Sequence, residues 1–91
     1  LESTFQERNM LRLREWWARR RSYPVKWRRA AFALDAFSYM TAAEMEQLSD
    51  EIQELVHRYR HRVEDASTRP KGALPVHLLA YGHPLPGGNP D

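Results

Sequence analysis

The stretch 41–63, TAAEMEQLSDEIQELVHRYRHRV, decides the fold of this 91-residue chain. It opens with the pattern of a capping box, in which a Thr at the N-cap and a Glu three residues later each accept a hydrogen bond from the other's backbone N–H. Thr41 and Glu44 occupy these two positions. Met40 and Met45 have the spacing of a hydrophobic staple, a contact that sets the direction in which a chain enters a helix. We therefore predict that a helix begins directly after Thr41.

The residues after the capping box carry an apolar stripe at helical spacing. Apolar side chains recur there at steps of three or four residues, which places them on one helix face. They are Met45, Leu48, Ile52, Leu55, Tyr59 and Val63, with Val56 beside them. We predict a helix over about 42–65. At 1.5 Å per residue it would be roughly 36 Å long, more than the diameter of about 30 Å of a compact globule of this size. The stripe therefore needs the first helix or a second copy of the chain to cover it.

Another helix is predicted near the start of the chain, over about 4–21. Leu13, Trp16 and Trp17 follow the spacing of one helix face. Pro24 ends the helix, because the residue before a proline avoids the α region. A short helical or irregular turn is expected next, near Trp27.

Two segments, 31–39 and 75–81, alternate apolar and polar residues as strands do, although the first also fits a helix face. A lone strand leaves its backbone groups unpaired, so we expect the two to pair with each other or with a neighbouring protomer. The predicted fold class is α+β, with two main helices and a small antiparallel sheet. We predict one module over 1–84 and a flexible tail over 85–91, which is rich in Pro and Gly.

Charge is unevenly distributed along the chain, whose formal net charge is only +2. From Arg12 to Arg29 there are eight basic residues and one acid, Glu15, whereas the rest carries six basic and eleven acidic residues. Such a split is typical of a phosphate-binding patch, or of a dipole that allows copies of a chain to complement each other.

The composition excludes several kinds of protein. Because there is no Cys, disulfides and Cys-based zinc sites are excluded. A chain this short buries too little surface to be very stable alone, so oligomerisation is the most available source of further burial. No apolar run approaches the roughly 20 residues of a membrane span, and no signal peptide opens the chain. We therefore expect a cytoplasmic protein without membrane contact.

No pattern in the sequence indicates catalysis or a cofactor. A nucleophile with a nearby base is not found, and neither is a glycine-rich phosphate loop. His57 and His61 are spaced to share one helix face, but no third ligand lies close in the sequence. We predict solvated histidines, no metal, no cofactor, no catalytic residues and no enzyme activity.

The basic and aromatic stretch 12–29 has two interpretations. In the one we favour, the tryptophans are core or interface anchors and the arginines form a solvated rim, because tryptophans at helical spacing beside leucine are usually buried. In the other, the cations bind phosphates while the rings stack on bases. The candidate phosphate contacts are Arg19, Arg20, Arg21, Lys26, Arg28 and Arg29.

The order of these features resembles a known family. A basic helix with paired tryptophans precedes residues 39–45 (YMTAAEM), the long helix ends in 59–62 (YRHR), and a strand-like segment follows at 75–79 (PVHLL). Over about 11–84 this is similar to the region that follows the winged helix-turn-helix in ArsR-like transcriptional regulators of high-GC bacteria. The helix start departs from that pattern, with Met in place of Leu and a single Glu.

The resemblance implies a cytoplasmic homodimeric regulator in which this region dimerises and senses an effector. No DNA-reading winged helix is found in these residues, so DNA would be bound through a domain absent from this chain. The metal-binding cysteines of some ArsR-type sensors are absent as well, and no motif identifies a small-molecule effector. Because the sequence begins at Leu1 without a methionine, we expect a fragment or a processed product.

On these grounds we predict the dimerisation and effector-sensing part of a bacterial transcriptional regulator. The predicted dimer and core anchors are Trp16, Trp17, Trp27, Leu48, Ile52, Leu55 and Tyr59. The alternative is a small basic nucleic-acid-binding module that uses 12–29. A third hypothesis is a monomeric adaptor that captures a partner helix on its exposed stripe.

Overall fold

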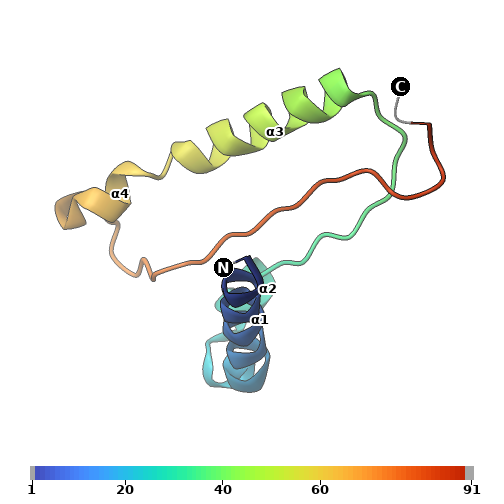
Figure 1. Ribbon diagram of the computed structural model, residues 1–91. Helices are drawn as coiled ribbons and strands as arrows, with labels where there is room; N and C mark the ends of the chain where they lie inside the picture. The colour runs from blue at the N-terminus through green and yellow to red at the C-terminus, as the bar shows by residue number, and fades with distance from the viewer. Residues whose placement is uncertain (1, 90–91) are drawn as a thin grey trace. The chain divides into compact units, whose positions relative to one another are not determined.

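The computed structural model describes residues 2–89, with side chains from Thr4 onward, as a series of helices joined by long loops (Figure 1). The elements in chain order are α1 (Glu2–Arg19), the 3-10 helix η1 (Arg20–Ser22), α2 (Val25–Ala30), α3 (Ala42–His57), α4 (His61–Glu64) and the 3-10 helix η2 (Ala66–Thr68). The chain divides into two compact units, one up to Phe37 and one from Ser38.

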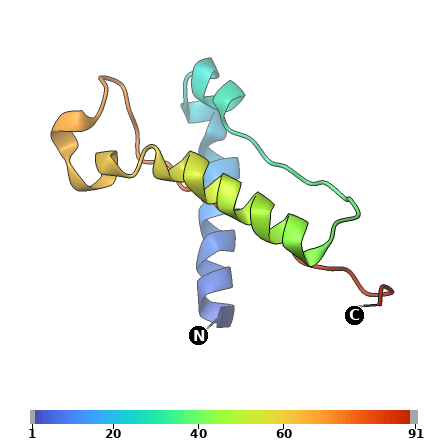
Figure 2. The ribbon, with the colours of Figure 1, turned by 90° about the horizontal axis from the view of Figure 1, so that it is seen from above.

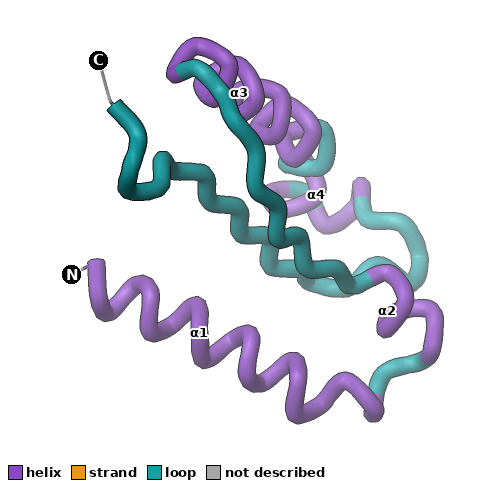
Figure 3. Tube along the Cα trace, turned by 90° about the vertical axis from the view of Figure 1, so that its right-hand side faces the viewer, coloured by secondary structure: helices purple, strands orange, loops and turns teal. Residues whose placement is uncertain are grey.

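The predicted α+β fold class is wrong, because no strand is present among residues 2–89. Segments 31–41 and 73–85, which include both predicted strands, have no regular secondary structure (Figure 3). Leu34 in the first segment is 87% exposed. An alternating pattern specifies which face a side chain would take in a sheet, but a strand is stable only when its backbone groups pair with a neighbour. The alternation of apolar and polar residues does not supply a neighbouring strand.

The first unit is built on α1 and α2, which lie close to the expected positions. At the end of α1 the Ser22 hydroxyl donates to the Arg19 carbonyl oxygen at 2.6 Å, and the Arg20 guanidinium donates to the Trp17 carbonyl oxygen at 2.7 Å. These bonds satisfy carbonyls that a helix end leaves without a partner. The carbonyl of Pro24 then accepts from the Trp27 amide at 3.0 Å and opens α2.

The second unit begins at the capping box of α3, which the structure confirms. The backbone N–H of Glu44 donates to Thr41 Oγ1 at 3.1 Å, and the backbone N–H of Thr41 donates to Glu44 Oε1 at 2.9 Å. Both bonds satisfy donors that the first turn of a helix cannot pair internally. The long helix therefore starts where the sequence predicts.

The end of the long helix differs from the prediction, since α3 stops at His57 and a turn over 58–60 precedes α4 (Figures 1 and 2). The amides of Tyr59 and Arg60 donate to carbonyls only three residues back, at 3.1 Å each. Bonds of this type tighten the chain and end a regular α-helix. Residues 57–62 hold only basic and aromatic side chains, and like charges at i, i+4, such as Arg58 and Arg62, destabilise a helix. At 16 residues, α3 is about 24 Å long.

Local hydrogen bonds also close the segment after α4. Asp65 Oδ1 accepts from the Ser67 amide at 3.0 Å and from the Ser67 hydroxyl at 2.6 Å. The Arg69 guanidinium donates back to the carbonyls of Arg62 at 2.6 Å and Val63 at 3.1 Å. A turn at Gly72, whose positive φ of 87° suits a residue without Cβ, then starts the return of the chain.

Neither unit has an apolar core among residues 4–89. The only buried side chain in that range is polar, Asn9, which accepts a hydrogen bond from the Arg12 guanidinium at 3.1 Å. Within the second unit, Gly82 approaches the α3 face near Met45, whose Cε would lie 3.6 Å from a Cβ at position 82. Helix-local hydrogen bonds, and not burial of apolar surface, account for most of the order described here. The predicted single module over 1–84 stays a prediction.

We expect Thr41→Ala to destabilise the first turn of α3 by about 1 kcal/mol, because the substitution removes the hydroxyl that accepts from the Glu44 amide. Amide hydrogen exchange at Glu44 should then accelerate by roughly fivefold, and the helical circular dichroism signal should fall. Thr41→Ser is the matched control, since it keeps the acceptor. Equal exchange rates in the two variants would show that the capping box does not stabilise α3.

Candidate functional site

The most prominent surface in the second unit is the apolar face of α3, which we call the α3 seam: Met45, Leu48, Ile52, Leu55 and Val56. Leu48 is 44%, Ile52 38% and Leu55 52% exposed, while Met45 is half-buried. These side chains lie three or four residues apart on one regular helix, so they form a continuous stripe. Exposed apolar stripes of this kind mark surfaces that bind another protein.

Of the four anchors predicted on the long helix, the structure brings three together and separates the fourth. Leu48, Ile52 and Leu55 share the face of α3, whereas Tyr59 lies in the turn after the helix end. The guanidinium of Arg62 lies over the Tyr59 ring, 5.1 Å from the ring centre. The seam is therefore confined to the regular turns of α3.

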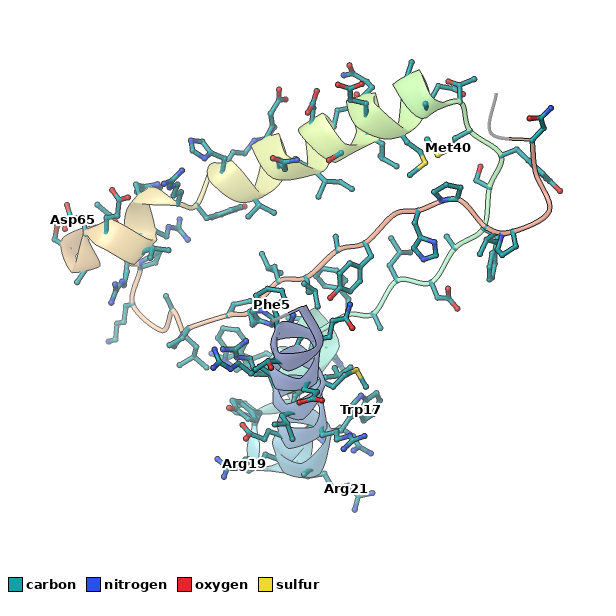
Figure 4. The ribbon with its side chains drawn as sticks, viewed as in Figure 1. Phe5, Trp17, Arg19, Arg21, Met40 and Asp65 are labelled. Atoms are coloured by element: carbon teal, nitrogen blue, oxygen red, sulfur yellow. The ribbon has the colours of Figure 1, made fainter. Side chains whose placement is uncertain are left out.

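The three predicted tryptophan anchors belong to the first unit and have different surroundings. Trp16 is half-buried and contacts the ring of Tyr23, with ring centres 5.2 Å apart at an interplanar angle of 57°. Trp27 on α2 is half-buried as well. Trp17 is 53% exposed and projects from α1, as Figure 4 shows. Adjacent residues on a helix point about 100° apart, so Trp16 and Trp17 serve different surfaces.

The six candidate phosphate contacts form a basic surface at the end of α1, in η1 and on α2, and all of them are exposed except Arg20, which is half-buried. Arg19 and Arg21 project outward in Figure 4, and the guanidinium of Arg20 lies over the exposed Trp17 ring at 4.7 Å from its centre. None of the six forms an ion pair within residues 4–89, where the one ion pair joins Arg60 and Glu64 at 3.9 Å. Their positive charge is available to a partner.

Charge on α3 is of the opposite sign. The helix holds five acidic residues and neither Lys nor Arg: Glu44, Glu46, Asp50, Glu51 and Glu54. The hydrogen bonds that the backbone N–H and the side chain of Thr41 make with the Glu44 carboxylate lower the pKa of Glu44 from its ordinary value of 4.5. Likewise, hydrogen bonds from the Ser67 hydroxyl and, to a smaller extent, from the Ser67 amide lower the pKa of Asp65 from its ordinary value of 3.8. Both carboxylates therefore stay charged to a lower pH than they would in the unfolded chain.

The described residues offer little to a metal or a small molecule. In residues 4–89, no group of three His, Asp or Glu side chains is arranged to hold a metal ion. A depression lined by Gln53, Glu54, His57 and Arg58 is open to solvent. No helix within residues 2–89 combines the length and apolar character needed to cross a bilayer.

Two residues that organise the surface lack a clear signal in the sequence. Tyr23 covers Trp16 from the link between α1 and α2, and only the seven-residue spacing between them, two helical turns, hints at the contact. Arg69 closes the α4 turn from seven residues away by donating to the carbonyl of Arg62. Nothing in the sequence distinguishes Arg69 from the other arginines, which are expected to be solvated.

Comparisons with protein-family models, with curated protein sequences and with solved structures find no match to this chain. The resemblance to ArsR-like regulators therefore rests on the quoted residues alone.

We expect the start of α3 to lose stability as the pH falls below about 4.5, the ordinary pKa of Glu44. A carboxylate whose folded pKa is lowered contributes stability above its unfolded pKa, and that contribution is lost as the pH falls through the folded pKa. Glu44→Gln keeps an acceptor for the Thr41 amide but does not titrate. Helix content followed by circular dichroism from pH 7 to pH 2 should therefore change less in this variant. Superimposable curves would contradict a role for the ionised Glu44.

Proposed function

We propose that this chain is a homodimerisation module of a cytoplasmic bacterial transcriptional regulator, and that it associates through the α3 seam. The observation that carries the proposal is the exposure of an apolar helix face at regular spacing, within a chain whose described residues bury no apolar side chain. An exposed apolar helix face favours association, because each Å² of apolar surface removed from water contributes roughly 25 cal/mol.

The length of α3 supports the same conclusion. An isolated helix of about 12–15 residues is only marginally stable in water, because helix nucleation is unfavourable. At 16 residues, α3 exceeds that length by little, and its seam has no cover from an apolar core. A second copy that covers the seam would stabilise the helix and remove the apolar face from water in one step.

The regulator role is supported by the residue pattern at the start of α3 and just after its end. Residues 40–44 and 59–62 resemble the corresponding residues of ArsR-like regulators, with Met40 in place of Leu and a single Glu, in the region that follows the winged helix. A two-fold dimer holds two DNA-binding heads at a fixed separation, which is how such regulators match two half-sites. No motif in the sequence identifies an effector for this role.

A second candidate function is phosphate binding by the basic surface. The exposed Trp17 ring with the Arg20 guanidinium stacked on it is the observation that favours this function. Aromatic rings next to cations are typical of proteins that bind single-stranded nucleic acid, since bases stack on the ring while the backbone meets the charges.

We expect Leu55→Asp to weaken the homodimer by at least about 100-fold, because burial of one leucine stabilises by about 1.5–3 kcal/mol and the substitution occurs twice in a symmetric dimer. Size-exclusion chromatography with light scattering, over a hundred-fold range of concentration and at two salt levels, measures the change. Val76→Asp is the matched control, because Val76 is an exposed apolar residue outside the seam.

A wild-type chain that stays monomeric at every concentration would overturn the dimerisation proposal. The same pair of variants also tests the regulator role. Fused to a winged-helix head that cannot dimerise, the wild-type chain and Val76→Asp should restore binding to a two-fold operator, and Leu55→Asp should not. If no fusion binds, a dimer would have some other role.

If the basic surface binds phosphate, its affinity for single-stranded DNA should fall with salt, with a slope of about −0.7 per neutralised phosphate. The triple variant Arg19→Ala, Arg20→Ala, Arg21→Ala should then lose most of the binding measured by fluorescence anisotropy. The control variant Arg58→Ala, Arg60→Ala, Arg62→Ala removes equal charge outside the basic surface. Binding that the first triple variant leaves unchanged would rule out the second candidate.

A further inference from the structure

The α3 seam follows the heptad pattern of a two-helix pair. In a heptad labelled a to g, the apolar a and d positions lie three and four residues apart and form the contact line between helices. Met45 and Ile52 occupy a positions of α3, while Leu48 and Leu55 occupy d positions. Leu48, Ile52 and Leu55 are exposed, and Met45 is half-buried next to Gly82, so the contact line is open from Leu48 to Leu55.

The charges beside this contact line are separated by sign along the chain. The first ten residues of α3 contain only acids among the charged residues, namely Glu44, Glu46, Asp50 and Glu51. Residues 57–62 contain only basic ones, namely His57, Arg58, Arg60, His61 and Arg62. The segment 44–62 is therefore acidic at its start, within α3, and basic at its end, from His57 through the turn and the start of α4 that follow.

We propose that a second copy of this chain covers the α3 seam in an antiparallel orientation, so that the acidic start of each α3 lies beside the basic segment 57–62 of the other chain. This inference rests on the proposed dimerisation and specifies its geometry. Met45 then meets the partner's Leu55, and Leu48 meets the partner's Ile52. Glu44 and Arg58, both at g positions, lie at opposite ends of the contact line. In the antiparallel pair, Glu44 of each chain therefore faces Arg58 of the other chain.

Charge decides the orientation because the apolar residues fit both directions. A parallel pair would place the acidic starts of the two helices at one end and the two arginine-rich segments at the other, with no oppositely charged residues facing each other beside the contact line. An antiparallel pair gains two contacts between Glu44 and Arg58, and only the two copies of Glu51 meet as like charges at its middle. Like charges in adjacent positions destabilise, and residues flanking a coiled-coil contact line set its orientation. Antiparallel helices also place the positive end of each helix dipole near the negative end of the other. In an identical chain the acidic end meets a basic end on both sides. We therefore assign a second copy of this chain, and not an unrelated helix, as the partner that covers the seam.

Disulfide trapping tests the orientation directly, because the full chain contains no Cys. The variants Met45→Cys and Leu55→Cys are mixed under reducing conditions, checked by light scattering for dimers, oxidised and analysed by intact mass. We expect the mixed disulfide to form at least about tenfold faster than either disulfide between identical chains. Identical positions would lie ten residues apart along antiparallel helices, about 15 Å, and a disulfide needs Cα atoms within about 7 Å.

A variant outside the contact line keeps the test valid if a seam substitution weakens the dimer. Glu51→Cys lies at a g position near the middle of α3, where an antiparallel pair brings the two copies of residue 51 together. It should form a disulfide between identical chains. Asp50→Cys is its neighbour at the outer f position and should remain a thiol.

The outcomes separate the orientation from the dimerisation proposal. Disulfides of Met45→Cys with itself and of Leu55→Cys with itself would mean a parallel pair and overturn the antiparallel geometry, while the dimer would stand. A wild-type dimer in which neither the seam variants nor Glu51→Cys is trapped would place the interface elsewhere and overturn the inference as well. A wild-type monomer would overturn both proposals.

Discussion

Burial of apolar surface is the constraint on which this chain depends. Within residues 4–89 every large apolar side chain keeps part of its surface in water, and the one buried side chain is the polar Asn9. Hydrophobic burial is the dominant favourable contribution to folding, and it must offset the conformational entropy lost when residues are ordered. Order in this chain therefore comes mainly from local hydrogen bonds, and the proposed dimer would add the burial of apolar surface that the described residues lack.

The local bonds explain why the helices begin and end where they do. The reciprocal bonds of Thr41 and Glu44 open α3, and the short i to i−3 bonds of Tyr59 and Arg60 close it. Such bonds act over three or four residues and do not require a core. They can hold α3 in the form that presents Leu48, Ile52 and Leu55 on one face.

Charge and apolar pattern together account for the proposed association. The α3 seam supplies affinity, because apolar area is removed from water. The acidic start and basic end of the same segment supply orientation, because electrostatic complementarity selects partners more than it strengthens binding. The basic surface around Arg19–Arg21 lies in the other unit and is free of ion pairs among the described residues, so it can act independently of the seam.

The sequence by itself determined the features that depend on neighbours within one helical turn. The capping box at Thr41 and the apolar spacing of the seam were predictable, since both follow from contacts at i+3 or i+4. The end of α1 before Pro24 was predictable because the residue before a proline avoids the α region. The segment after His57 shows the limit of the same reasoning. There the apolar stripe continues to Tyr59 and Val63, and the predicted helix to residue 65 neglected the repulsion between closely spaced arginines.

Only the tertiary structure decided the features that need a distant partner. The strands predicted over 31–39 and 75–81 do not form within the described residues, because alternation cannot supply the neighbour that a strand must pair with. The contact of Trp16 with Tyr23 and the bond from Arg69 to the Arg62 carbonyl link residues seven positions apart. Long flexible side chains can make many such contacts, so their spacing in the sequence does not select one. The exposure of the α3 seam is likewise a property of the folded chain, because a stripe of Leu and Ile reads the same in a sequence whether a core covers it or not.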